Sequence, residues 1–193
     1  MNIQYLIDHN YPIVQYKKGA VIYEPGATPR AVYFIKRGEV RMVTVNDDGK
    51  EFIQGIFKAH QYFGEPALLV NKPYLAYTIA TQDSEIIPVN RTQFYQLIDE
   101  DRDFNMELIK TMSNRLFYKS MMLEELANEQ AEHRVRTLIS YLFKSLEKDG
   151  VLDVTRQQLA DMSGLRVETV IRIVKKLAAQ KELRLLRGKI IKT

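Results

Sequence analysis

Short apolar runs and turn signals alternate along the first ninety residues. The runs are rich in β-branched and aromatic residues, and Lys18-Gly19, Pro25-Gly26 and Arg37-Gly38 stand between them. Asp48-Gly49, between two alternating segments, predicts a tight hairpin. Regular short strands with no helix between them predict an antiparallel sandwich or barrel. The expected strands cover residues 14–16, 20–23, 32–35, 40–45, 52–57, 76–81 and 84–89.

A helical period replaces the strand pattern after about residue 90. Before that point, Pro66 can occupy the first turn of a short helix. Residues 99–128 then form one long predicted helix without Gly or Pro, with Phe104 and Leu108 near its start. About three heptads of seam positions are typical of a dimer helix, and Lys119 interrupts them. The alternative is a long helix packed on its own barrel. The seam positions are Ile109, Met112, Leu116, Leu123 and Leu126.

The stretch 155–180 contains two helical patterns around a glycine. Thr155 and Gln158 predict a capping box at the start of the first helix, and Gly164 follows its end. The second pattern, from about residue 167, has a buried stripe and a basic, hydrogen-bonding outer face. Its stripe consists of Val170, Ile173, Val174 and Leu177. Its outer face consists of Arg166, Glu168, Thr169, Arg172, Lys175 and Lys176.

Two helices joined in this way suit a helix-turn-helix that reads DNA, and equally an ordinary αα-corner with a solvated face. A helix over residues 130–147 and a short strand over 151–154 precede the pair. Two short strands, 183–186 and 189–192, follow it as a hairpin or wing. The last third of the chain is therefore predicted to be a winged helix-turn-helix.

Charge divides the chain in the same place. Residues 1–128 hold 14 Lys and Arg against 16 Asp and Glu, whereas residues 129–193 hold 14 against 8. A basic end on a slightly acidic body favours a polyanion-binding module. No apolar stretch approaches a membrane span and no export signal is recognisable, so we expect a cytoplasmic protein without a membrane partner.

The sequence offers no candidate for catalysis or for a metal site. The absence of cysteine excludes disulfides, thiolate metal sites and iron–sulfur clusters. The three histidines, His9, His60 and His133, lie in separate segments, so each is interpreted as a surface or capping residue and not as a haem ligand. No nucleophile–base pair, phosphate loop or metal-ligand spacing is present, so we do not expect an enzyme.

Several motifs resemble the Crp/Fnr family of bacterial transcription regulators over essentially the whole chain. They lie at 33–41 (YFIKRGEVR), 49–57 (GKEFIQGIF), 63–65 (FGE), 155–157 (TRQ) and 164–172 (GLRVETVIR). The resemblance implies an α+β fold: an N-terminal antiparallel β-roll of the cyclic-nucleotide-binding type, a long dimerisation helix and a C-terminal winged helix-turn-helix. The implied domains are 1–98, 99–128 and 129–193. The implied partners are double-stranded DNA and a second copy of the chain. RNA polymerase is a further partner that the resemblance allows, although no surface for it is recognisable.

By resemblance, the helix at about 167–179 enters the major groove and reads base edges. Arg172 can pair with guanine and Glu168 can accept from cytosine, whereas the alternative is an i,i+4 surface ion pair. Val167 favours a half-site resembling TTGA, and Ile171 departs from the small polar residue of the oxygen-responsive branch. The residues expected on DNA phosphates are Thr155, Arg156, Gln157, Lys175, Arg187 and Lys189.

The sensor domain departs from the family's cyclic-nucleotide pocket. Gly64 and Glu65 match the ribose-binding pair, but Tyr74 and Leu75 stand where the family has an Arg followed by Ser or Thr. A cyclic phosphate buried without a cation would carry a large desolvation penalty. We therefore expect no cofactor and no response to cyclic AMP, the alternatives being a cyclic-nucleotide-responsive regulator or a sensor that binds a protein partner. Lys119 and Ser120 align with the family's base-contacting residues on the long helix, and Lys119 can also set helix register.

Overall fold

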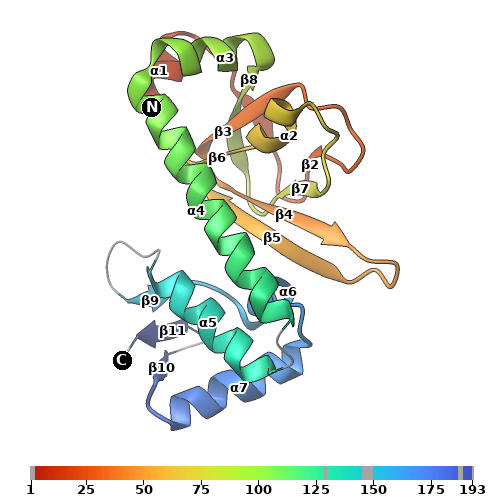
Figure 1. Ribbon diagram of the computed structural model, residues 1–193, viewed down its shortest axis with the longest axis vertical. Helices are drawn as coiled ribbons and strands as arrows, with labels where there is room; N and C mark the ends of the chain where they lie inside the picture. The colour runs from red at the N-terminus through yellow and green to blue at the C-terminus, as the bar shows by residue number, and fades with distance from the viewer. Residues whose placement is uncertain (1–2, 128–129, 145–149, 187–188, 193) are drawn as a thin grey trace. The chain divides into compact units, whose positions relative to one another are not determined.

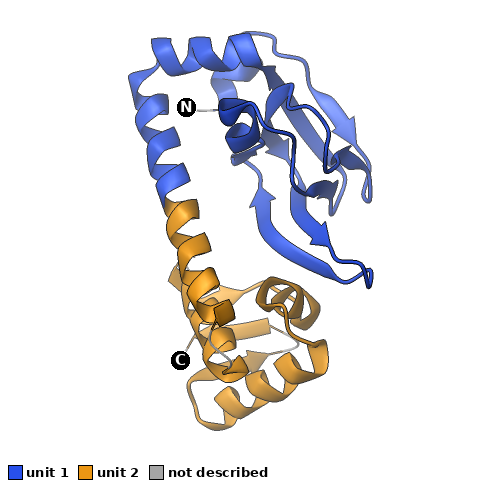
Figure 2. Ribbon diagram, turned by 45° about the vertical axis from the view of Figure 1, so that its right-hand side comes forward, with its two compact units in different colours: residues 1–113 blue, residues 114–193 orange. Residues whose placement is uncertain are grey.

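The computed structural model describes residues 3–127, 130–144, 150–186 and 189–192. The chain divides into two compact units, Met1–Ser113 and Asn114–Thr193 (Figure 2). The boundary falls inside one continuous helix, α4 (Arg102–Ala127), which is the long helix expected at 99–128 (Figure 1). Within the described residues, no helix is both long and apolar enough to cross a membrane.

Two four-stranded antiparallel sheets form the body of the first unit. Their strand orders are β1-β8-β3-β6 and β2-β7-β4-β5, so each sheet pairs strands from both ends of the unit. This arrangement confirms the predicted antiparallel β architecture. The strands are β1 (Val14–Tyr16), β2 (Val21–Tyr23), β3 (Ala31–Arg37), β4 (Glu39–Val45), β5 (Glu51–Lys58), β6 (Tyr62–Phe63), β7 (Tyr77–Ala80) and β8 (Ser84–Asn90).

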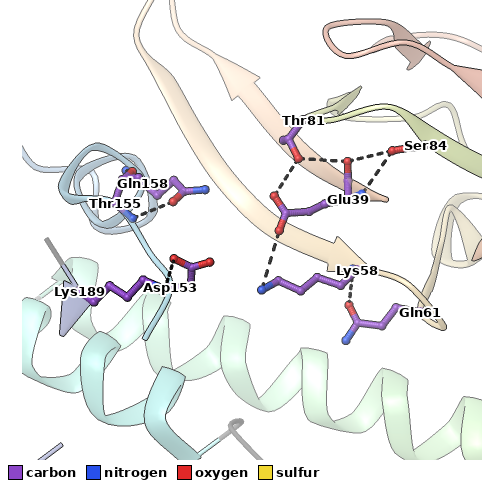
Figure 3. A network of polar contacts seen from close by, with 9 residues as sticks. All are labelled: Glu39, Lys58, Gln61, Thr81, Ser84, Asp153, Thr155, Gln158 and Lys189. Carbon is purple, nitrogen blue, oxygen red and sulfur yellow. Dashed lines mark hydrogen bonds and ion pairs between the residues drawn. The ribbon is translucent and has the colours of Figure 1, made fainter. Parts of the chain in front are cut away.

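The predicted turns connect these strands. The Asp48-Gly49 turn joins β4 to β5, which pair from Glu39–Lys58 to Val45–Glu51. Gly38, between β3 and β4, has φ of 107°, and a Cβ at this position would lie 2.1 Å from the Ser84 hydroxyl. Only glycine satisfies both the backbone angle and the space there. The Glu39 side chain and main chain then bond to Thr81 and Ser84 at the start of β8 (Figure 3).

Helices pack on strand β3 in the first unit. α2 (Glu65–Val70) has Pro66 in its first turn, as expected, and α3 (Arg91–Glu100) begins with a capping box made by Asn90 and Gln93. Phe104 and Leu108, from the start of α4, are buried in the same apolar cluster as Phe94 and Leu97 of α3. The first turns of the long helix thus belong to the core of this unit.

Two elements were not expected from the sequence. A six-residue helix, α1 (Ile3–Asp8), buries Ile3 and Leu6, and the two-residue strand β6 pairs with β3. Both elements are too short to show a hydrophobic period, because a single turn of helix presents only two residues to the core. Tertiary contacts therefore determine them.

The second unit contains three further helices and a small sheet. The helices are α5 (Ala131–Lys144), α6 (Arg156–Ser163) and α7 (Val167–Ala179). The sheet has the order β10-β11-β9, with strands β9 (Val151–Leu152), β10 (Leu183–Leu186) and β11 (Lys189–Lys192). β10 and β11 pair antiparallel and make the predicted wing, whose tip at 187–188 lies outside the described residues.

Candidate DNA-binding site

The first helix of the site begins at a complete capping box. The Thr155 hydroxyl accepts from the Gln158 N–H at 3.0 Å, and the Gln158 side chain accepts from the Thr155 N–H at 2.8 Å (Figure 3). These two bonds satisfy donors that have no partner inside the helix. Thr155 and Gln157 are exposed at this end of α6, and the N-terminal end of a helix suits an anion because of its free N–H groups and its dipole.

A tight turn joins α6 to α7. Gly164 adopts the left-handed conformation at φ of 70° and caps α6 through its N–H to the Ala160 carbonyl. Arg166 is extended and α7 begins at Val167, two residues after Leu165. The Ser163 side chain, fully buried at this turn, donates to the Leu159 carbonyl at 2.6 Å. A left-handed glycine is needed here because a β-carbon is strained in this conformation.

α7 separates an apolar face from a polar face. The predicted stripe is confirmed as buried, with Val170 and Val174 fully inaccessible. On the outward face Glu168, Arg172 and Lys175 are exposed, and the Ile171 side chain is partly exposed beside them. The helix therefore presents a carboxylate, a guanidinium and a methyl-bearing side chain on one accessible surface.

Glu168 and Arg172 do not form the surface ion pair that was the alternative interpretation. Among the described residues, neither side chain has a hydrogen-bond or ion-pair partner. Lys176, on the same helix, has an ion-pair partner: its ammonium lies 2.6 Å from the Glu132 carboxylate, which also pairs with Arg136. Those contacts hold the pKa of Glu132 below its usual value. Glu168 and Arg172 are thus left available to an external ligand, whereas Lys176 is engaged within the unit.

The residues expected on phosphates differ in their surroundings. The Arg156 Nη1 atom is buried and has no hydrogen-bond partner in the described chain, and burial lowers the pKa of this guanidinium. Gln157 donates to Asp161 at 2.8 Å, and Lys189 lies 3.6 Å from Asp153 (Figure 3). Lys175 and Thr155 are exposed. Arg187 lies outside the described residues.

Comparison with known families matches both units of the chain. The cyclic nucleotide-binding domain family matches residues 13–101, and the Crp-like helix-turn-helix domain family matches residues 133–192. The chain belongs to the Crp/Fnr family. It is accordingly a DNA-binding transcription regulator, and the two-helix site described above is its Crp-like helix-turn-helix.

Relatives of this Crp/Fnr regulator cover nearly its full length. The cAMP-activated global transcriptional regulator CRP of Pasteurella multocida is 28% identical over 92% of this chain and 88% of its own. The global nitrogen regulator of a Nostoc species is 26% identical over 93% and 84%. The structure of FixK2 from Bradyrhizobium japonicum shares the fold, with a TM-score of 0.77, 22% identity, and coverage of 94% and 92%.

In the first unit of this Crp/Fnr regulator, aromatic rings surround Tyr74, the residue that sequence resemblance aligned with the family's arginine. Tyr74 is 4% exposed and stacks on Tyr23, with ring centroids 3.6 Å apart and planes 8° apart. Its hydroxyl donates to the Ala31 carbonyl at 3.2 Å. Burial, and then the neighbouring Tyr33, raise the pKa of Tyr74 far above its usual value. The side chain is therefore a neutral part of the core.

The other residues expected in the pocket are divided between the two units. Gly64 caps α2 in the left-handed conformation against the Tyr33 ring, and Glu65 is fully buried behind it. The Leu75 side chain is 82% exposed. Lys119 and Ser120 are exposed on α4 in the second unit. An open cavity of about 530 Å³ does lie beside Tyr74, and its lining residues are Val21, Ile22, Tyr23, Glu24, Ala27, Thr28, Arg30, Tyr33 and Tyr74.

Sequence reasoning missed two features of these units. Tyr23 and Tyr33, which pack around Tyr74, come from strands β2 and β3; Tyr23 lies outside every motif, and Tyr33 begins the motif at 33–41, which does not indicate this packing. Arg134 is buried in the second unit and donates to main-chain carbonyls of Glu125 and Ser163. The signal in the sequence that could have indicated it is that Arg134 is a charged residue on the same face of α5 as the apolar Leu138, four residues later.

Proposed function

We propose that this Crp/Fnr regulator binds a pseudo-palindromic operator as a homodimer. In this proposal residues 1–98 are a sensor, residues 99–128 pair with the same helix of a second copy, and residues 129–193 read DNA. Dimer formation is supported by the apolar surface of α4, where Ile109 is 53% exposed, Leu116 67% and Leu123 70%. Large aliphatic side chains repeated at heptad spacing on an exposed helix face are typical of a helix-pairing surface.

The observation that carries the proposal concerns Glu168 and Arg172 on α7. Both side chains are exposed, and neither has a hydrogen-bond or ion-pair partner among the described residues. In a major groove the Arg172 guanidinium can donate to guanine O6 and N7, and the Glu168 carboxylate can accept from a cytosine N4 amine. Val167 precedes this pair at the start of the helix, and Ile171 offers an apolar contact for a thymine methyl group. These residues support a half-site resembling TTGA.

Phosphate contacts would flank the reading helix. Thr155 caps α6, and Arg156 and Gln157 begin its first turn, where N–H groups and the helix dipole favour an anion. The guanidinium of Arg156 would add a positive charge at this helix start. Lys175 on α7 and Lys189 on the wing would add sequence-independent attraction, as would Arg187 beyond the described residues.

We propose that the first unit does not bind a cyclic nucleotide in the manner of the family. Binding the cyclic phosphate requires a cation, and the side chain at the family's arginine position is Tyr74, which is neutral, stacked and already hydrogen-bonded. The next residue, Leu75, points into solvent instead of offering a hydroxyl. We therefore propose that cyclic AMP does not control this regulator.

Selection of bound duplexes from a random DNA pool, with and without cyclic AMP, tests these proposals together. We expect enrichment of two inverted TTGA-like half-sites about one helical turn apart, roughly 34 Å, and the same enrichment in both arms. Half-sites without TGA would contradict the assignment of Glu168 and Arg172. A strong dependence on cyclic AMP would contradict the interpretation of the Tyr74 site.

A further inference from the structure

A buried carboxylate lies near the end of the long helix. Glu125 stands two residues before α4 ends at Ala127, and it is 6% exposed. A carboxylate is costly to bury unless hydrogen bonds replace its lost water. A glutamate on a helix normally remains in solvent, as the neighbouring Glu124 does. Its burial therefore requires specific partners.

Two side chains of α5 supply those partners. The His133 Nδ1 atom lies 2.8 Å from Glu125 Oε2, and the Thr137 hydroxyl donates to Oε1 at 2.9 Å. His133 and Thr137 are four residues apart and so lie on the same face of α5. Each carboxylate oxygen thus has its own hydrogen-bond partner on that face.

Arg134 extends the same connection to the helix-turn-helix. Its Nε atom donates to the Glu125 main-chain carbonyl at 2.9 Å, and its Nη1 atom donates to the Ser163 carbonyl at 3.2 Å. Both carbonyls lie in the last turn of a helix, α4 and α6, where a cation interacts favourably with the helix dipole. A buried guanidinium therefore bridges the end of the long helix and the end of the first DNA-binding helix.

We propose that Glu125 is a positioning residue that sets the half-site spacing this regulator accepts. The inference rests on the proposed dimer and its DNA contacts. Glu125, His133, Arg134 and Thr137, together the Glu125 clasp, hold α5 and α6 against the end of α4. In a dimer joined through α4, the clasp determines the distance between the two recognition helices. The recognition surface itself contains none of these residues.

The physical reason is that rigidly connected recognition helices can bind half-sites at the wrong separation only if the complex is strained. Two helices that must enter successive major grooves tolerate little displacement when their supports are fixed. If the Glu125 carboxylate is removed, α5 keeps only the main-chain bonds of Arg134 in the clasp, and each helix-turn-helix can rotate on the end of α4 and adapt to other spacings. The preference among spacings is then reduced, while the contacts with a single half-site are retained.

The experiment compares Glu125→Ala with the matched control Glu124→Ala, an exposed glutamate on the preceding position of α4. Binding is measured for the full-length protein on duplexes with two TTGA half-sites at graded separations, and on a duplex with one half-site. For the unaltered protein and the control, we expect the affinity at the best half-site separation to be on the order of tenfold higher than at the neighbouring separations. For Glu125→Ala, we expect this ratio to fall to about twofold with less than about a threefold change on the single half-site.

Thr137→Val provides a second variant that keeps the side-chain shape while removing one donor. It should shift the spacing profile in the same direction as Glu125→Ala, and it remains informative if the alanine variant does not fold. An unchanged spacing profile in a folded variant would overturn the clasp while leaving the proposed function intact. Loss of single half-site binding in step with the paired sites would also overturn it, because that result indicates a general structural role. If the unaltered protein binds none of these duplexes, the proposed function fails and the clasp proposal fails with it.

Discussion

At the scale of single residues, identical charges on one helix have different roles because their neighbours differ. Lys176 and Arg172 both lie on the outer side of α7, but only Lys176 meets a carboxylate, Glu132 on α5. The sequence predicted the outer face correctly and could not separate these two side chains. Glu132 lies 44 residues away in the chain, so only the packing of α5 against α7 brings it into contact.

Replacing Arg172 by alanine tests base reading. We expect Arg172→Ala to weaken binding to the selected operator by about 1–3 kcal/mol and to relax the preference at one base position, because a bidentate contact is lost. The control Lys175→Ala should weaken specific and random duplexes alike and reduce the slope of log affinity against log salt by about 1. Titrations at several salt concentrations give both quantities. Equal losses on specific and random DNA for Arg172→Ala would exclude its assignment.

Substitutions at the adjacent residues Tyr74 and Leu75 test whether Tyr74 belongs to the core of the first unit. Tyr74→Ala removes a buried stacked ring and should lower the free energy of unfolding by about 3–5 kcal/mol. Leu75→Ala, at an 82% exposed position, should change it by less than about 0.5 kcal/mol. Urea unfolding followed by circular dichroism measures both. Similar values for the two variants would show that Tyr74 is not part of the core.

At the scale of elements, local signals predicted helix starts better than they predicted short segments. The Thr155–Gln158 and Asn90–Gln93 capping boxes both form, although only the first was expected. α1 was missed because one turn of helix carries too little pattern, although it buries Leu6 completely. A capping box depends on two residues three apart, whereas α1 depends on an apolar cluster shared with distant strands.

The Thr155 cap can be tested without disturbing the core. Thr155→Ala should lower the free energy of unfolding by about 1 kcal/mol, because it removes an acceptor from the first turn of α6. Thr155→Ser keeps the hydroxyl and should lie close to the unaltered protein. Chemical denaturation of the two variants side by side provides the comparison. A serine variant as unstable as the alanine variant would assign the effect to the lost methyl group instead.

At the scale of the whole molecule, α4 contributes buried side chains to both units. The middle of the helix carries apolar side chains that are exposed. Phe104 and Leu108 are buried in the first unit and Met122 in the second. Leu116 and Leu123 belong to the predicted seam and remain exposed, and so does Phe117, which the seam prediction omitted. The start of the long helix therefore packs on its own β unit, as one interpretation expected, whereas pairing through its exposed middle stays a proposal.

Charge placed on that surface tests the dimer. Leu116→Glu combined with Leu123→Glu should weaken self-association by about 3 kcal/mol or more, on the order of a hundredfold in Kd, because like charges would face each other across the seam. The fold should persist, since both side chains are exposed. Asn114→Glu, on the opposite side of the helix, is the control. Sedimentation measures the association, and a double variant that remains as dimeric as the control would remove α4 from the interface.

The sequence by itself determined the order and type of the main elements, because hydrophobic period, turn residues and capping pairs act over a few neighbouring positions. It also located the two helices of the helix-turn-helix and the basic end of the chain. Only the tertiary structure decided which polar groups are engaged and which are free. Tyr74 stacks on Tyr23 across 51 residues, and Glu125 is buried because α5 brings His133 and Thr137 to it. Burial and pairing are properties of the packed chain, so no local pattern carries them.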